Sequence, residues 1–77
     1  MVEHPLIERD PEILSGKPVI KGTRMSVELI LERLAGGHSV EEMLDDYPFL
    51  TREEIYAALE YAAEVVHEAT RDQRVAS

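Results

Sequence analysis

The stretch SVELILERLAGGHSVEEMLDDYPFLTREE, residues 26–54, decides the fold of this chain. Apolar residues recur in it at i, i+3, i+4 and i+7, which is the period of an amphipathic helix. The two runs are Val27, Ile30, Leu31 and Leu34, followed by Val40, Met43, Leu44 and Tyr47. Gly36-Gly37 favours a left-handed helix end after the first run, and Pro48 stops the second. We therefore predict helices over residues 26–36 and 39–47.

Capping residues fix where the helices begin. Ser26 is an N-cap without a full capping box, whereas Ser39 with Glu42 and Thr51 with Glu54 each have the spacing of a capping box. We predict a third helix over residues 51–70 and a frayed tail over residues 71–77. The buried face predicted for the third helix consists of Ile55, Leu59, Ala62 and Val66.

The first 25 residues lack the helical period of the rest of the chain. They are rich in proline and glycine and contain short β-branched runs. The segments LIE (6–8) and PVIKGT (18–23) are typical of two short strands, and Gly16 can adopt a positive φ in the turn region between them. We predict a single domain, residues 1–77, of the mainly α class. It is a three-helix, helix-turn-helix-like bundle preceded by a short N-terminal β-hairpin over residues 1–25.

Composition narrows the possible partners. The chain has 77 residues, no cysteine and a formal net charge of -8. A domain this small has a marginal core, so we expect support from a homodimer or from a partner protein. An acidic body repels nucleic-acid backbone and attracts basic proteins. The apolar runs are too short to span a membrane and the N-terminus does not resemble a signal peptide, so we expect a cytoplasmic protein.

The only local surplus of positive charge lies in SGKPVIKGTR, residues 15–24. A phosphate-binding P-loop is excluded there, because Pro11 and Pro18 occupy positions at which that motif needs glycine and serine or threonine. Two interpretations stay open for Lys17, Lys21 and Arg24: lysines that protect an edge strand, or contacts to phosphate or to a partner.

The third helix would be the recognition helix if the bundle bound DNA. Thr51 and Arg52 at its start are candidate contacts, but the many glutamates along it argue against strong DNA binding. Dimerisation through this helix is the alternative. Candidate interface residues are Val19 and Ile20 of the hairpin and Tyr56 and Tyr61 of the helix.

The titratable residues do not suggest catalysis. The three histidines lack the spacing of metal ligands, and the paired acids lie on a solvated helix face. We expect no catalytic residue, no metal and no cofactor.

The run from Ile13 to Ala63 resembles domain-of-unknown-function family 433, which is widespread in prokaryotes. The resemblance rests on GKPVI, GTR, the Gly36-Gly37 and Tyr47-Pro48 breaks, the helix starts at Ser39 and Thr51, and the alanine-rich last helix. It implies a homeodomain-like or winged-helix-like three-helix domain behind a hairpin, and for many members an antitoxin paired with a small PIN-like ribonuclease.

Three functional hypotheses follow. The first is a non-enzymatic antitoxin that neutralises a PIN-like ribonuclease toxin by direct binding and represses its own operon as part of that complex. The alternative is a stand-alone helix-turn-helix DNA-binding regulator that contacts phosphates through Lys17, Lys21, Arg24 and Arg52. The third is a structural dimer with no nucleic-acid role.

Overall fold

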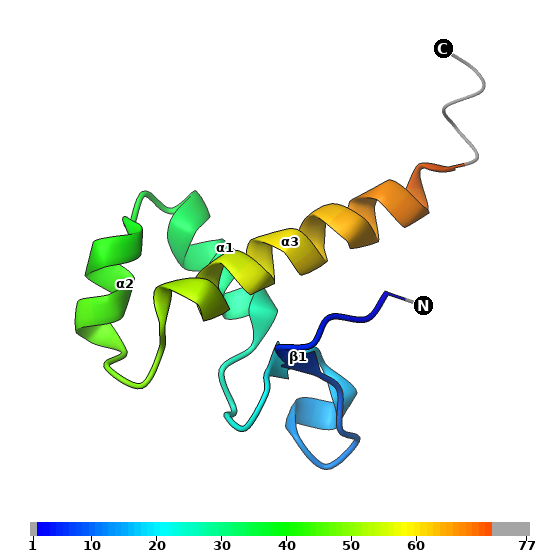
Figure 1. Ribbon diagram of the computed structural model, residues 1–77, viewed down its shortest axis with the longest axis horizontal. Coiled ribbons are helices and arrows are strands. Elements are labelled where there is room, and N and C mark those ends of the chain that lie inside the picture. The colour runs from blue at the N-terminus through cyan, green and yellow to red at the C-terminus, as the bar shows by residue number, and fades with distance from the viewer. Residues whose placement is uncertain (1, 72–77) are drawn as a thin grey trace.

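The computed structural model describes residues 2–71, which form a small hairpin followed by three helices (Figure 1). The hairpin strands are β1, Ile7–Glu8, and β2, Val19–Ile20, with a short 3-10 turn, η1, at Leu14–Gly16 between them. The helices are α1, Val27–Ala35, α2, Val40–Asp46, and α3, Arg52–Ala69. The predicted mainly α architecture is therefore confirmed. Of the predicted frayed tail, residues 72–77 lie outside the described residues.

Helix α1 begins and ends where its local chemistry predicts. The Ser26 hydroxyl accepts a hydrogen bond from the Leu29 N–H at 3.0 Å, which satisfies one free donor of the first turn. At the other end, Gly37 takes a φ of +101°. This lets the Gly37 N–H donate to the Leu34 carbonyl and the His38 N–H donate to the Arg33 carbonyl, both at 3.1 Å. The pair of bonds is a Schellman motif, and it turns the chain towards α2.

Helices α2 and α3 both start with the predicted capping box. The Ser39 N–H donates to a Glu42 carboxylate oxygen at 2.8 Å, and the Glu42 N–H donates back to the Ser39 hydroxyl at 3.0 Å. Thr51 and Glu54 repeat this exchange at 3.0 and 3.1 Å. The hydrogen bond from the Ser39 backbone holds the pKa of Glu42 below its usual value.

Strand β2 is paired along both of its edges. On one side it runs antiparallel to β1, with Ile7 opposite Ile20 and Glu8 opposite Val19. On the other side the chain turns back on itself, so that the Ile20 N–H donates to the Met25 carbonyl and the Val27 N–H donates to the Pro18 carbonyl, both at 2.9 Å. The strand is shorter than the predicted segment because the chain turns after Ile20, with Gly22 at a φ of +80°.

The core draws its largest wholly buried side chains from the hairpin and from all three helices. They are Val19, Ile20, Ile30, Met43 and Ile55. On α3 the other buried residues are Ala57, Ala58 and Tyr61. The small alanine side chains allow α1 to approach α3 closely.

The predicted buried face of α3 is wrong for two of its four residues. Leu59 is 39% exposed and Val66 is 61% exposed, whereas Tyr61 is buried. Apolar residues surround this helix on more than one side, so periodicity alone does not select the face that packs. Residues 63–69 are exposed all round, because α3 continues past the other elements towards the C-terminus (Figure 1). No helix within residues 2–71 has the length and apolar character needed to cross a membrane.

Candidate partner-binding surface

The cations predicted to bind phosphate or a partner are partly neutralised within the chain. Lys17 forms an ion pair with Glu28 of α1, with Nζ 2.9 Å from the carboxylate oxygen, and this contact raises the pKa of Lys17. Lys21 and Arg24 are exposed on the turn after β2, and neither forms an ion pair within residues 2–71. A Glu8 carboxylate oxygen accepts the Gly22 N–H at 3.0 Å, which places an acid beside these two cations.

The two candidate contacts at the start of α3 are engaged in holding that helix. The Thr51 hydroxyl accepts the Glu54 N–H, as its N-cap role requires. Arg52 reaches across to α2 and lies 2.8 Å from a carboxylate oxygen of Glu41. That ion pair raises the pKa of Arg52 and lowers the pKa of Glu41. Arg52 therefore comes to the surface as half of an ion pair, beside the acids Glu53 and Glu54.

The four predicted interface residues divide into core and surface. Val19 and Ile20 have no exposed area and Tyr61 is 6% exposed, so the structure places these three in the interior. This corrects the expectation that they contact a partner. Both edges of β2 are already hydrogen-bonded, so a partner strand cannot add to it, and the side chains on its faces are buried. Tyr56 is 46% exposed and is the only one of the four with substantial surface.

The surface that periodicity missed is an apolar groove between α1 and α3, with a volume of about 320 Å³. Its apolar lining comes from Pro18, Val27, Leu31, Ala62, Val65 and Val66, and the Lys17–Glu28 ion pair borders it. Val65 and Val66 are exposed on the part of α3 that extends past the body. The adjacent valines were the available signal, because two neighbouring apolar residues cannot both fit on the single narrow face predicted for this helix.

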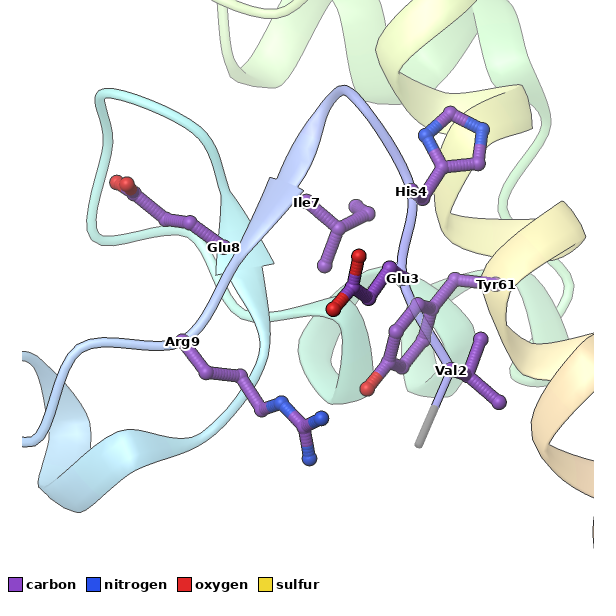
Figure 2. A pocket seen from close by; sticks show the side chains of 7 residues that line it. All are labelled: Val2, Glu3, His4, Ile7, Glu8, Arg9 and Tyr61. Atoms are coloured by element: carbon purple, nitrogen blue, oxygen red, sulfur yellow. The ribbon is translucent and has the colours of Figure 1, made fainter.

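A second hollow, of about 270 Å³, lies between the N-terminal segment and α3 (Figure 2). Its lining includes Glu3, Glu8 and Arg9 from the N-terminal side and Tyr61 from α3. His4 joins the two sides. Its Nδ1 accepts the Leu6 N–H at 3.1 Å, so its proton lies on Nε2 and points to a Glu60 carboxylate oxygen 2.8 Å away. The hydrogen bonds of His4 thus fasten the N-terminal segment to α3.

Neither hollow contains an arrangement of ligands for a metal. Within residues 2–71, no group of three or more His, Cys, Asp or Glu side chains is placed to hold a metal ion. The larger groove has apolar walls that are open to solvent, on a chain whose net charge is -8.

A family model and a solved structure name the same family for this chain. A family model described as a protein of unknown function, DUF433, matches residues 7–62. The uncharacterized protein y4eO of Sinorhizobium fredii (strain NBRC 101917 / NGR234) is 44% identical over 57 residues, which are 74% of this chain and 26% of that protein. The chain thus spans about a quarter of the length of this curated relative.

A solved structure gives the same answer for the fold. The crystal structure of a DUF433 member protein from Anabaena variabilis ATCC 29413 matches with a TM-score of 0.75 and 28% identity, over 94% of this chain and 69% of that one. The family model ends at residue 62, so Val65 and Val66 of the groove lie beyond the matched region.

Proposed function

The chain belongs to the DUF433 family of proteins of unknown function, and we propose that this member is a non-enzymatic antitoxin that binds and neutralises a PIN-like ribonuclease. In this proposal the apolar groove between α1 and α3 receives an apolar segment of the ribonuclease. The resulting complex represses the operon that encodes both proteins. Its setting is the cytoplasm, where such a ribonuclease meets its RNA.

The observation that carries the proposal is the groove itself, because it is apolar yet solvent-exposed. Val65 and Val66 are 41% and 61% exposed, and leaving them so in water is unfavourable unless another surface covers them. A single apolar groove on a small domain is the kind of site that receives an amphipathic helix of a partner.

The charge of the two helices that build the groove indicates what kind of segment fits. The acids on the two helices that build it outnumber the arginines: Glu28, Glu32, Glu53, Glu54, Glu60, Glu64 and Glu68 against Arg33 and Arg52. A partner segment with an apolar face flanked by lysine or arginine would match both properties. RNA-cleaving enzymes need cationic surfaces to hold their substrate, so a ribonuclease is a suitable source of such a segment.

The alternative, a stand-alone DNA-binding regulator, receives less support. Of its four proposed phosphate contacts, Lys17 and Arg52 are paired with Glu28 and Glu41. A phosphate would have to displace a carboxylate at both positions. The first turn of α3, which would enter the major groove, carries Glu53 and Glu54. We therefore favour protein binding over phosphate binding.

The test is co-expression of the full chain with the product of the adjacent gene, which under this proposal encodes the PIN-like ribonuclease. We expect the two proteins to copurify and the chain to relieve the growth arrest that the ribonuclease causes. Val65→Glu places a charge in the groove and should abolish both effects. Leu31→Gln tests the same groove from α1. His67→Glu is the matched control, because it adds a carboxylate to the same exposed segment at a residue outside the groove lining.

Two results would overturn the proposal. One is a ribonuclease that neither copurifies with the wild-type chain nor loses toxicity in its presence. The other is full neutralisation by both groove variants, once circular dichroism has shown that they are folded.

A further inference from the structure

The hollow between the N-terminal segment and α3 contains a buried hydroxyl that the protein leaves without a partner. Tyr61 is 6% exposed, so its ring lies in the interior, and its hydroxyl takes part in none of the hydrogen bonds within residues 2–71. No side-chain nitrogen or oxygen of a buried residue in this range is both sealed from solvent and without a partner. The Tyr61 hydroxyl is therefore open to the hollow that it lines, and its hydrogen-bond partner comes from whatever fills that space (Figure 2).

Two charged side chains line the same hollow and also lack partners in the described part of the chain. Arg9 follows β1, and Glu3 belongs to the N-terminal segment. Neither forms an ion pair within residues 2–71, with the other or with a third group. In the view of Figure 2, the Tyr61 hydroxyl lies between the Arg9 guanidinium and the Glu3 carboxylate. The hollow thus offers one cation, one anion and one neutral hydroxyl.

The other polar residues of the lining are engaged elsewhere. A Glu8 carboxylate oxygen accepts the Gly22 N–H at 3.0 Å. Both ring nitrogens of His4 are occupied, one by the Leu6 N–H at 3.1 Å and the other by a Glu60 carboxylate oxygen at 2.8 Å. These side chains form the walls of the hollow, and they leave the guanidinium, the carboxylate and the hydroxyl as the groups that are free to bind a ligand.

Charge and size narrow the class of ligand. A plain anion would pair with Arg9 but would also lie beside Glu3, on a chain whose net charge is -8. A plain cation would meet the opposite conflict, and a neutral molecule would leave both charges without a partner. A zwitterion satisfies both of them. The hollow has a volume of about 270 Å³, and pockets for drug-sized ligands span roughly 300–1,000 Å³, so the ligand is a small one.

We propose that this hollow binds a free α-amino acid. The carboxylate of the ligand accepts hydrogen bonds from the Arg9 guanidinium and from the Tyr61 hydroxyl. The ammonium of the ligand donates to the Glu3 carboxylate. Val2 and Ile7 supply the apolar part of the lining, which suits a short aliphatic side chain such as that of valine.

The bound amino acid joins three parts of the chain. Glu3 lies in the N-terminal segment, Arg9 directly after β1 and Tyr61 on α3, so these contacts exist together only in the folded protein. A ligand that binds only the folded state stabilises it, and the melting temperature rises with ligand concentration. This inference does not rest on the proposed ribonuclease, because the hollow and the apolar groove share only Tyr61 among their lining residues.

The first experiment titrates the full chain with L-valine and follows its backbone amides by NMR. Two analogues of valine separate the charges: isovalerate lacks the ammonium, and isobutylamine lacks the carboxylate. We expect valine to shift the amide signals of Glu3, Arg9 and Tyr61 in a saturable way and to raise the melting temperature. Each analogue should bind at least about ten-fold more weakly, since it loses a hydrogen bond to a charged group.

Two results of this titration would overturn the proposal. One is the absence of any saturable change with valine, which would mean that water alone fills the hollow. The other is isovalerate that binds as tightly as valine, which would make the hollow a site for plain anions.

The second experiment removes the three binding groups one at a time. Tyr61→Phe keeps the buried ring and deletes only the hydroxyl, so it should fold normally and bind valine roughly ten-fold more weakly. Glu3→Gln and Arg9→Gln should weaken binding in the same way. Glu53→Gln and Arg24→Gln are the matched controls, because they make the same changes of charge at exposed residues outside the lining. Valine binding that is unchanged in Tyr61→Phe, or weakened equally by the controls, would refute the site.

Discussion

Replacing Ile20 with alanine tests whether β2 supplies the core or a partner contact. The side chain has no exposed area and packs in one cluster with Ile30, Met43 and Ile55. Removing a buried isoleucine down to alanine costs roughly 2–5 kcal/mol, from lost burial plus the cavity that remains. Each neighbour belongs to a different helix, so the site cannot collapse without moving whole elements. We therefore expect a loss of about 3 kcal/mol in the free energy of unfolding.

That loss is large for a chain of this length. At about 0.05–0.15 kcal/mol per residue, the whole free energy of unfolding is roughly 4–12 kcal/mol. The chain has no tryptophan, so urea unfolding is best followed by far-ultraviolet circular dichroism of its helices. We expect the urea midpoint to fall sharply while the slope with urea stays the same. Two protein concentrations separate folding from association, because dimerisation makes stability depend on concentration.

The adjacent residue offers the control for this experiment. Lys21 is exposed, so Lys21→Ala should change the free energy of unfolding by no more than about 0.5 kcal/mol. The reasoning is refuted if Ile20→Ala unfolds at the wild-type midpoint. If that variant also failed to self-associate, Ile20 would belong to an interface, as the sequence alone led us to expect.

Three further predictions concern caps, pH and backbone. Thr51→Ala removes the N-cap of α3 and should lower the free energy of unfolding by about 1 kcal/mol in the same urea assay. The pKa of Glu42 is lowered in the folded state, so its carboxylate stabilises the fold above the ordinary glutamate pKa, and this stability is lost as the pH falls through the lowered pKa. Glu42→Gln should therefore make the melting temperature less dependent on pH at acid pH. Gly22 has a φ of +80° with open space around it, so Gly22→Ala should cost about 1–2 kcal/mol through the backbone alone, and Gly22→Asn should melt at a higher temperature than Gly22→Ala.

Local chemistry explains why the helix boundaries could be predicted. A capping box needs only residues three apart, as at Ser39 and Glu42, and a Schellman end needs only a glycine such as Gly37. Both signals are complete within a few residues of sequence. The hairpin was predictable for a similar reason. The pairing along the second edge of β2 was not, because its partner there is the segment 25–27 that leads into α1.

The candidate site depends on residues far apart in sequence, which is why most of it could not be predicted. The groove is lined by Leu31 of α1 and Val65 of α3, and no pattern within one helix reveals that the two residues share a surface. The pairing of Arg52 with Glu41 also joins two elements, and it turns a candidate phosphate contact into a link between helices. Tyr61 was assigned to an interface because it lies off the face predicted from Ile55 and Leu59, and only packing against the body selects the side of α3 that is buried.

The two-sided pairing of β2 has a consequence for how the chain opens. The Lys21 N–H is bonded to Leu6 on one side of the strand, and the Ile20 and Val27 N–H groups are bonded across the other side. Val27 is also the first residue of α1, so the strand cannot separate from residues 25–27 without freeing the start of that helix. The amide protons of Ile20, Lys21 and Val27 should therefore show one common free energy of opening in hydrogen–deuterium exchange, as parts of a single cooperative unit. The backbone amides of the N-terminal hairpin would then be protected against exchange as strongly as those at the start of α1, and the hairpin would open only together with that helix.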